Sequence, residues 1–142
     1  MATLCDVNCL LAFCYDRHMH HVQAITWLDS QDELSVVLCR VTQLSLLRLL
    51  TNKSVMDADV CNLKQAWDIY DTLIADERFD FAIEPMDLEQ HLRRYTVGER
   101  VSPKLWQDAY LAAFARAAKL HFVTFDGGFQ QYEGLRLTLL EG

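Results

Sequence analysis

Three aspartates stand at points of the chain where ionised side chains are uncommon. Asp6 and Asp126 each come directly after a short apolar run, and Asp108 opens the apolar segment 108–114. Burying an ionised carboxylate is costly unless a partner compensates its charge. Two carboxylates about 4 Å apart repel each other by roughly 4 kcal/mol at an effective dielectric constant near 20. If the fold brings these three acids together, a bound divalent cation is the simplest compensation.

A centre built from carboxylates favours one kind of chemistry. Carboxylates bind hard ions such as Mg²⁺ or Mn²⁺, which keep several waters and bind phosphate oxygens. Such an ion activates water for attack on a phosphodiester, and a second ion stabilises the leaving oxygen. Taken singly, Asp6 and Asp126 also fit strand-end caps, and Asp108 fits an exposed acid in a first helical turn. Their joint placement at element boundaries favours a site for metal-assisted phosphodiester hydrolysis.

The segments around these acids alternate between short β-type runs and helical patterns. The runs are apolar and rich in β-branched residues, as strands buried on both faces should be. We expect strands at residues 3–7, 34–39, 79–83, 121–125 and 135–140. The alternation predicts an α/β fold with a parallel sheet covered on both faces. Asp6 and Asp126 would then lie at the carboxyl edge of the sheet, near the topological switch point where functional residues gather.

Helix starts can be predicted from capping residues. Asn8 is a good N-cap for a helix beginning at Cys9, and Ser102-Pro103 is a strong start for the helix that carries Asp108 and runs to about Lys119. The amphipathic pattern over residues 57–75 predicts one long helix. Further helices are expected at residues 20–28, 44–50 and 87–95.

Composition limits the class of protein. The chain has 142 residues, of which 51% are apolar, so residues 1–142 fit a single domain with a real core. The N-terminus shows no signal-peptide pattern and no apolar run is long enough to span a bilayer, so we expect a cytoplasmic protein without membrane contact. Its five cysteines include no C-x-x-C pair, which indicates reduced, mostly buried thiols.

Charge limits how the chain could contact nucleic acid. The net charge of −7 argues against a surface that binds nucleic acid extensively, so any such contact must be local. The one basic stretch before the Asp108 segment contains Arg93, Arg94, Arg100 and Lys104. It either holds an RNA backbone or forms a solvated surface. Its position just before an acidic helix slightly favours RNA.

The ordered motifs resemble those of the PIN domain, and most of all the VapC-type toxins of bacterial toxin–antitoxin pairs. The resemblance covers nearly the whole chain and rests on the order and spacing of several motifs rather than on any single acid. The motifs are Asp6-Val7-Asn8, Thr42-Gln43, residues 46–52, residues 108–112 and residues 124–129.

The resemblance implies a three-layer α/β/α domain with a central parallel sheet of about five strands. It also implies a metal-dependent endoribonuclease in which Asp6, Asp108 and Asp126 bind Mg²⁺ or Mn²⁺. Asn8 and Thr124 match positions that support the carboxylates by hydrogen bonding. The implied substrate is single-stranded or structured RNA, tRNA included, and the implied partners are a cognate antitoxin and a second copy of the chain.

The chain departs from the family at one position. The second acid of the family aligns with Gln43, a neutral amide that can accept a hydrogen bond or orient a water but adds no charge. One alternative is therefore a non-catalytic PIN-like module that binds RNA or protein. A receiver-type phosphoacceptor domain is a second alternative, but it needs an acid pair after the first strand and a Lys after the fifth, and neither is present.

Overall fold

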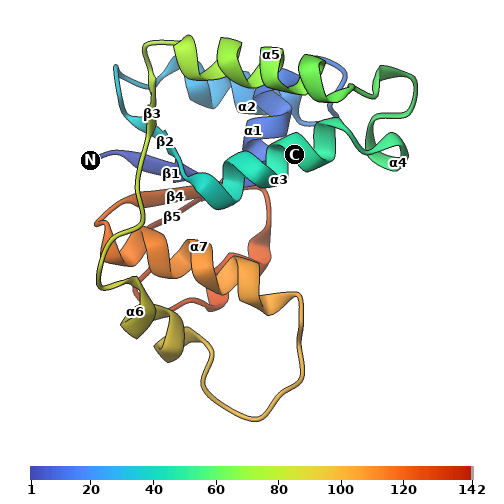
Figure 1. The fold of residues 1–142 in the computed structure, drawn as a ribbon. Coiled ribbons are helices and arrows are strands. Elements are labelled where there is room, and N and C mark those ends of the chain that lie inside the picture. The colour runs from blue at the N-terminus through green and yellow to red at the C-terminus, as the bar shows by residue number, and fades with distance from the viewer. Residues whose placement is uncertain (142) are drawn as a thin grey trace.

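The central feature of the computed structural model, which describes residues 1–141, is one five-stranded parallel sheet (Figure 1). The strands lie in the order β3-β2-β1-β4-β5, and every neighbouring pair is parallel. They are β1 Thr3–Cys5, β2 Val36–Leu38, β3 Phe79–Phe81, β4 His121–Thr124 and β5 Leu137–Leu139. All five predicted strands are present, each shorter than the apolar run that predicted it.

Helices cover both faces of this sheet, as Figure 1 shows. One face carries α1 (Val7–Cys14), α2 (His21–Asp29), α3 (Arg40–Leu50) and α5 (Leu63–Ala75), and the other carries α6 (Leu88–Tyr95) and α7 (Leu105–Ala117). Successive strand residues point to opposite faces. Accordingly, Cys5 packs in the core beneath α1 while Leu4 packs in the core beneath α7. The predicted three-layer α/β/α architecture is confirmed.

Helix α1 begins two residues earlier than predicted. Its N-cap is Asp6 rather than Asn8: the Asp6 carboxylate accepts a hydrogen bond from Val7 N at 2.8 Å, and its carbonyl accepts from Cys9 N and Leu10 N. An acid ending the strand can cap the helix directly because no loop separates the two elements. The Asn8 side chain is then free to contact β4.

The long helix predicted over residues 57–75 is wrong in its first part. The short helix α4 (Lys53–Met56) ends at Asp57, whose φ of +50° cannot continue a right-handed helix. A 3₁₀ turn, η1 (Asp57–Asp59), follows, and α5 starts only after Asn62. Asn62 and Gln65 form a reciprocal capping box, with hydrogen bonds of 2.8 and 2.9 Å.

Helix α7 also starts later than predicted. Ser102 is not its N-cap, because Leu105 N donates to the Ser102 carbonyl in a turn and Lys104 occupies the N-cap position. The last helical residue is Ala117, two residues before the predicted end. As a result Asp108 lies in the first turn of α7.

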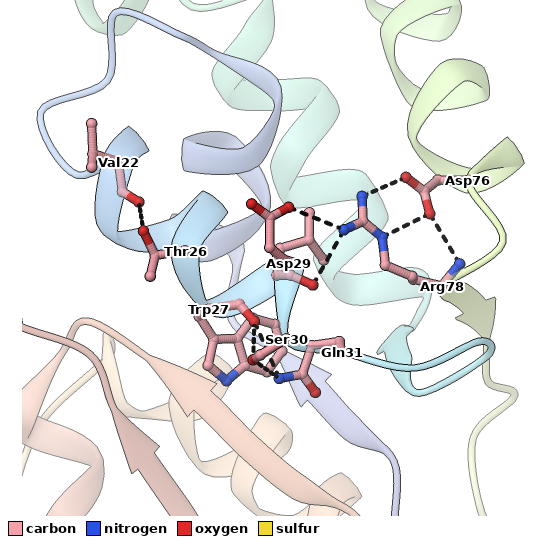
Figure 2. Close-up of polar contacts among 9 residues, drawn as sticks. Val22, Thr26, Trp27, Asp29, Ser30, Gln31, Asp76 and Arg78 are labelled. Atoms are coloured by element: carbon pink, nitrogen blue, oxygen red, sulfur yellow. Dashed lines mark hydrogen bonds and ion pairs between the residues drawn. The ribbon is translucent and has the colours of Figure 1, made fainter.

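Arg78 joins the edge strand β3 to helix α2 (Figure 2). Its guanidinium donates to Asp76 at 2.7 Å and to the Leu28 carbonyl at 3.2 Å, and it lies 3.5 Å from Asp29. The hydrogen bond from Arg78 lowers the pKa of Asp76. Arg78 precedes β3, so this junction lies at the amino edge of the parallel sheet, opposite the edge where the aspartates were predicted.

Two further features concern the cysteines and the lengths of the helices. All five cysteines are free, and Cys5, Cys9 and Cys39 are buried. Within residues 1–141, no helix has both the length and the apolar character needed to span a bilayer.

Candidate functional site

The topological switch point of the sheet lies between β1 and β4. These strands pair in parallel, with Cys5 opposite Val123, and the chain leaves β1 for β2 on the other side. Asp6 follows the last residue of β1, and Asp126 lies two residues after the end of β4. The structure therefore places both acids at the carboxyl edge of the sheet, where the chain leaves β1 and β4 in opposite directions. This is the usual position of ligand sites in open α/β sheets.

Asp6 is a buried carboxylate whose two oxygens are both hydrogen-bonded. Only 6% of the residue is exposed. One carboxylate oxygen accepts from Val7 N at 2.8 Å, and the other accepts from the Thr124 hydroxyl at 2.6 Å. These bonds fix the orientation of the carboxylate at the end of β1.

Thr124 connects three of the predicted site residues. Its wholly buried hydroxyl donates to Asp6 and accepts from Asp126 N at 3.0 Å and from the Asn8 side-chain amide at 3.4 Å. The Asn8 carbonyl oxygen lies 3.5 Å from Phe125 N. Thr124 and Asn8 thus hold Asp6 and the backbone of Asp126 in a fixed relation, and their supporting role in a catalytic centre stays a prediction.

Asp126 begins the short 3₁₀ helix η2 (Gly127–Gln131). Its Oδ1 accepts from Gly128 N at 2.8 Å, and a Cβ at Gly128 would lie 3.1 Å from the same oxygen. Unlike Asp6, Asp126 is exposed. The small residue at 128 lets the chain turn tightly over the carboxylate.

Asp108 reaches the same edge from α7. It is half-buried in the first turn of this helix, next to Ala109, which is buried against the sheet. Helix α7 packs its alanines closely on the sheet, with Ala112 and Ala113 wholly buried. This close packing determines where the first turn, and therefore Asp108, lies relative to the strand ends.

The pKa values of the acids reflect burial and mutual repulsion. Burial is the largest cause; the Thr124 and Val7 hydrogen bonds oppose it, the charges of Asp108 and Asp126 add to it, and the net result is a pKa of about 6 for Asp6. Burial and the charge of Asp126 raise the pKa of Asp108. The three acids therefore share one electrostatic environment in which a positive charge would stabilise the ionised forms.

The donor chemistry fits a hard divalent cation, but the side chains are not assembled as a cage. In the part of the chain described, residues 1–141, no group of three or more His, Cys, Asp or Glu side chains is arranged to hold a metal ion. Asp6 is fixed by its two hydrogen bonds, whereas Asp108 and Asp126 are more exposed. Binding an ion would require the two more exposed carboxylates to turn toward Asp6.

Gln43 lies on the first turn of α3 and is 4% exposed. Its side-chain carbonyl accepts a hydrogen bond from Arg40. Its amide group also interacts with the Tyr70 hydroxyl, where it partly offsets the burial that raises the pKa of that group. These contacts lead toward α5, and none of the hydrogen bonds of Gln43 within residues 1–141 reaches an aspartate. Its amide serves to fix α3 rather than the acids in this arrangement.

The structure separates the four predicted basic residues. Arg94 and Arg100 line one pocket. Arg93, one position along α6, instead pairs with Glu89 at 3.0 Å, and Lys104 caps the start of α7. The run of basic residues in the sequence is therefore not one continuous surface.

Tyr132 lies near the acids and was not identified from the sequence. Burial and the charges of Asp108 and Asp126 together raise the pKa of Tyr132 to about 12, so this ring lies close to the acids. Nothing in the spacing of Tyr132 marks it as different from a core aromatic. Only the path of the chain after η2 brings it to this place.

Comparisons with known proteins agree with this geometry. A model of the PIN domain matches residues 3–135. The chain is 42% identical over 142 residues to Ribonuclease VapC41 of Mycobacterium tuberculosis, covering 96% of this chain and 97% of the relative. It is also 29% identical over 125 residues to Ribonuclease VapC38 of the same species, covering 88% of this chain and 85% of the relative.

Solved structures share the fold at lower identity. VapBC2 from Rickettsia felis, bound to a fragment of promoter DNA, matches with a TM-score of 0.71 and 12% identity over 99% of this chain and 100% of that chain. The sarcin–ricin loop cleaving toxin VapC20 of Mycobacterium tuberculosis matches with a TM-score of 0.68 and 16% identity over 95% and 98%. Motif order, sheet topology and sequence identity thus agree, and the chain belongs to the PIN-domain family, among the VapC ribonucleases.

Proposed function

We propose that this protein is a divalent-metal-dependent endoribonuclease and the toxin of a toxin–antitoxin pair. The observation that carries the proposal is the Asp6 carboxylate, buried at the switch point within the electrostatic reach of Asp108 and Asp126. The related proteins are named ribonucleases. Several structures with this fold are of VapBC, and one is a toxin–antitoxin complex from Klebsiella pneumoniae, which supports an antitoxin partner.

In this proposal Asp6, Asp108 and Asp126 hold Mg²⁺ or Mn²⁺. When bound, the ion activates water and neutralises charge on the scissile phosphate. Thr124 and Asn8 keep the Asp6 carboxylate in place, because Thr124 donates to Asp6 and Asn8 donates to Thr124. The buried environment of Asp6 has a low dielectric constant, which strengthens the attraction of its carboxylate for a cation.

The proposal extends to the partners and the location. The substrate is RNA, with tRNA a candidate, and the protein acts in the cytoplasm as a homodimer that a cognate antitoxin inhibits. The size of the free protein by light scattering tests the dimer directly, and sequencing of RNA 5′ ends after expression of the protein identifies the substrate.

Substitution of the two more exposed acids tests the catalytic centre. Asp108→Asn and Asp126→Asn should each lower the rate of RNA cleavage in Mg²⁺ or Mn²⁺ by at least about 100-fold, because each removes a charge from the cation site. Asp71→Asn, an exposed acid on α5, is the matched control and should cleave normally. An Asp108→Asn protein that is folded and cleaves RNA at the wild-type rate would disprove the assignment of Asp108 to the cation site.

A non-catalytic RNA- or protein-binding module is the second candidate. It is favoured by Gln43, whose neutral amide adds no charge to the centre and is held by Arg40. This candidate predicts RNA binding with no cleavage in either ion over the concentrations at which related nucleases act.

A further inference from the structure

A basic pocket of about 450 Å³ opens between α6, α7 and the segment after η2. Three arginines from different parts of the chain line it: Arg94 on α6, Arg100 in the loop before α7, and Arg116 in the last turn of α7. None of the three forms an ion pair with an acid of residues 1–141. In a chain of net charge −7, such a cluster is a local site for an anion.

A chain of hydrogen bonds links this pocket to the acidic centre. Arg100 donates to the Gln131 side chain at 3.2 Å, and Gln131 donates to the Gly128 carbonyl at 2.9 Å. Gly128 N in turn donates to the Asp126 carboxylate at 2.8 Å. The arginine is therefore positioned by the same 3₁₀ helix that begins at Asp126.

Two hydrogen bonds fix the Arg116 guanidinium in the wall of the pocket. Its Nη1 donates to the Glu133 carbonyl at 2.7 Å and to the Tyr95 hydroxyl at 3.2 Å. Gly134 makes room for it: with φ at +79°, a Cβ there would lie 1.9 Å from the same nitrogen. Two of the arginines are thus fixed before any ligand arrives, which reduces the entropy lost on binding.

Tyr132 gives independent support for a ligand. Its side chain lines the pocket, only 5% of the residue is exposed, and its hydroxyl is buried without a hydrogen-bond partner. Buried hydroxyls rarely lack partners in native structures. The charges of both Asp108 and Arg100 act on this ring.

We propose that the pocket of Arg94, Arg100 and Arg116 binds a backbone phosphate of the RNA, one or more nucleotides from the phosphodiester that is cleaved. The inference rests on the proposed function and names a substrate contact for it. Planar guanidinium groups match phosphate oxygens in pairs of parallel hydrogen bonds. Eight residues separate Asp108 from Arg116, or about 12 Å along α7, so one strand can reach both places.

Binding of a labelled single-stranded RNA in EDTA, measured by fluorescence anisotropy, tests the pocket apart from metal-dependent cleavage. The double variant Arg94→Gln/Arg100→Gln should bind RNA about tenfold more weakly, because it loses charge-assisted hydrogen bonds. The slope of log affinity against log salt should fall in magnitude by about 0.7 for the lost phosphate contact.

The matched control is Arg17→Gln/Lys64→Gln, which removes the same charge from two exposed basic residues that pair with acids outside the pocket. It should change RNA affinity by less than about twofold. Gly134→Ala tests Arg116 without removing a charge: the displaced guanidinium should weaken RNA binding, provided the melting curve shows a folded protein.

The outcomes separate the pocket from the proposed function. If the wild type cleaves RNA but the Arg94→Gln/Arg100→Gln protein binds RNA as tightly as the wild type or the control, the pocket assignment is wrong and the nuclease stands. If the wild type binds RNA through the pocket but never cleaves it, the nuclease is wrong and the pocket stands. The proposal is overturned if a polyglutamate peptide binds the wild type as tightly as RNA does and loses as much affinity as RNA in the Arg94→Gln/Arg100→Gln protein. In that case the pocket binds an acidic protein segment.

Discussion

At the scale of single residues, Asp6 combines a structural and a chemical role. It caps α1 through its Oδ1 and lies buried at the strand end, where Thr124 donates to its other oxygen. The acid is therefore positioned without a metal, and its burial leaves an unfavourable charge that a cation would stabilise. The residue type and its place after an apolar run could be read from the sequence. The hydrogen bond from Thr124, 118 positions away, could not.

Asp6 should make the stability of the metal-free protein depend on pH. Its pKa is about 6 in the folded protein and near 3.8 when unfolded. The folded state therefore retains this proton between about pH 4 and 6, where the unfolded state has lost it. The free energy of unfolding should fall as pH rises through this range, by about 3 kcal/mol in all, and stay lower above it. Asp6→Asn should remove this dependence and be more stable than the wild type at pH 7.

Urea unfolding in EDTA at several pH values measures this effect. The relevant quantity is the difference between wild type and Asp6→Asn, since acids distant from residue 6 titrate equally in both proteins. Asp71→Asn serves as the control and should follow the wild-type profile. A difference that stays constant from pH 4 to 7 would show that Asp6 titrates normally in the folded protein.

Gln43 leads to a second prediction at this scale. Because Arg40 donates to the Gln43 side chain, Gln43→Glu should place the new carboxylate in an ion pair with Arg40. The affinity for Mn²⁺ in titration calorimetry should then change by less than about twofold, since the pair is electrically neutral. A large gain in affinity would instead place the side chain of residue 43 in the metal centre, as the family motif implies.

At the scale of elements, the sequence predicted which segments form strands better than where helices begin. All five strands were anticipated because each is a short, apolar, β-branched-rich run. The starts of α1, α5 and α7 were not, since each depends on which of several capping residues the backbone uses. Asp59 and Asn62 are both plausible caps for one helix. The extended backbone of Val60, with ψ of 135°, excludes a helix that begins after Asp59, and no pattern of hydrophobicity reveals it.

The capping box of α5 can be tested without touching the site. Asn62→Ala removes the acceptor for Gln65 N at the start of the helix. The loss should lower the free energy of unfolding by about 1 kcal/mol. Helix α5 lies on the opposite side of the sheet from α7 and carries none of the three aspartates, so RNA cleavage should be unchanged. Thermal melts and a cleavage assay on the same preparation check both expectations. A stability equal to that of the wild type would mean that α5 begins elsewhere in solution.

At the scale of the whole molecule, a chain of net charge −7 carries an acidic centre and a basic pocket, which hydrogen bonds from Arg100 through Gln131 and Gly128 link to Asp126. The composition predicts that any contact with nucleic acid must be local. It did not indicate where, because the arginines of the pocket come from α6, a loop and the end of α7. The candidate acids were identified because each directly follows or opens an apolar run. The pocket required the tertiary structure.

Metal binding should therefore be coupled to the stability of the entire domain. An ion that binds only the folded protein stabilises it by an amount that grows with the logarithm of ion concentration, about 2.7 kcal/mol at one hundred times the dissociation constant. For a domain of this size that raises the melting temperature by several degrees. Because a proton on Asp6 competes with the cation, the effect of Mn²⁺ should be small at pH 5 and larger at pH 7.5.

Differential scanning fluorimetry over a series of Mn²⁺ concentrations at the two pH values measures this coupling. Asp6→Asn is the informative comparison, since it keeps the helix cap but lacks the charge. Its melting temperature should respond weakly to Mn²⁺ and equally at both pH values. If wild type and Asp6→Asn respond alike, the ion binds elsewhere on this acidic surface, and Asp6 is then a buried cap rather than a metal ligand.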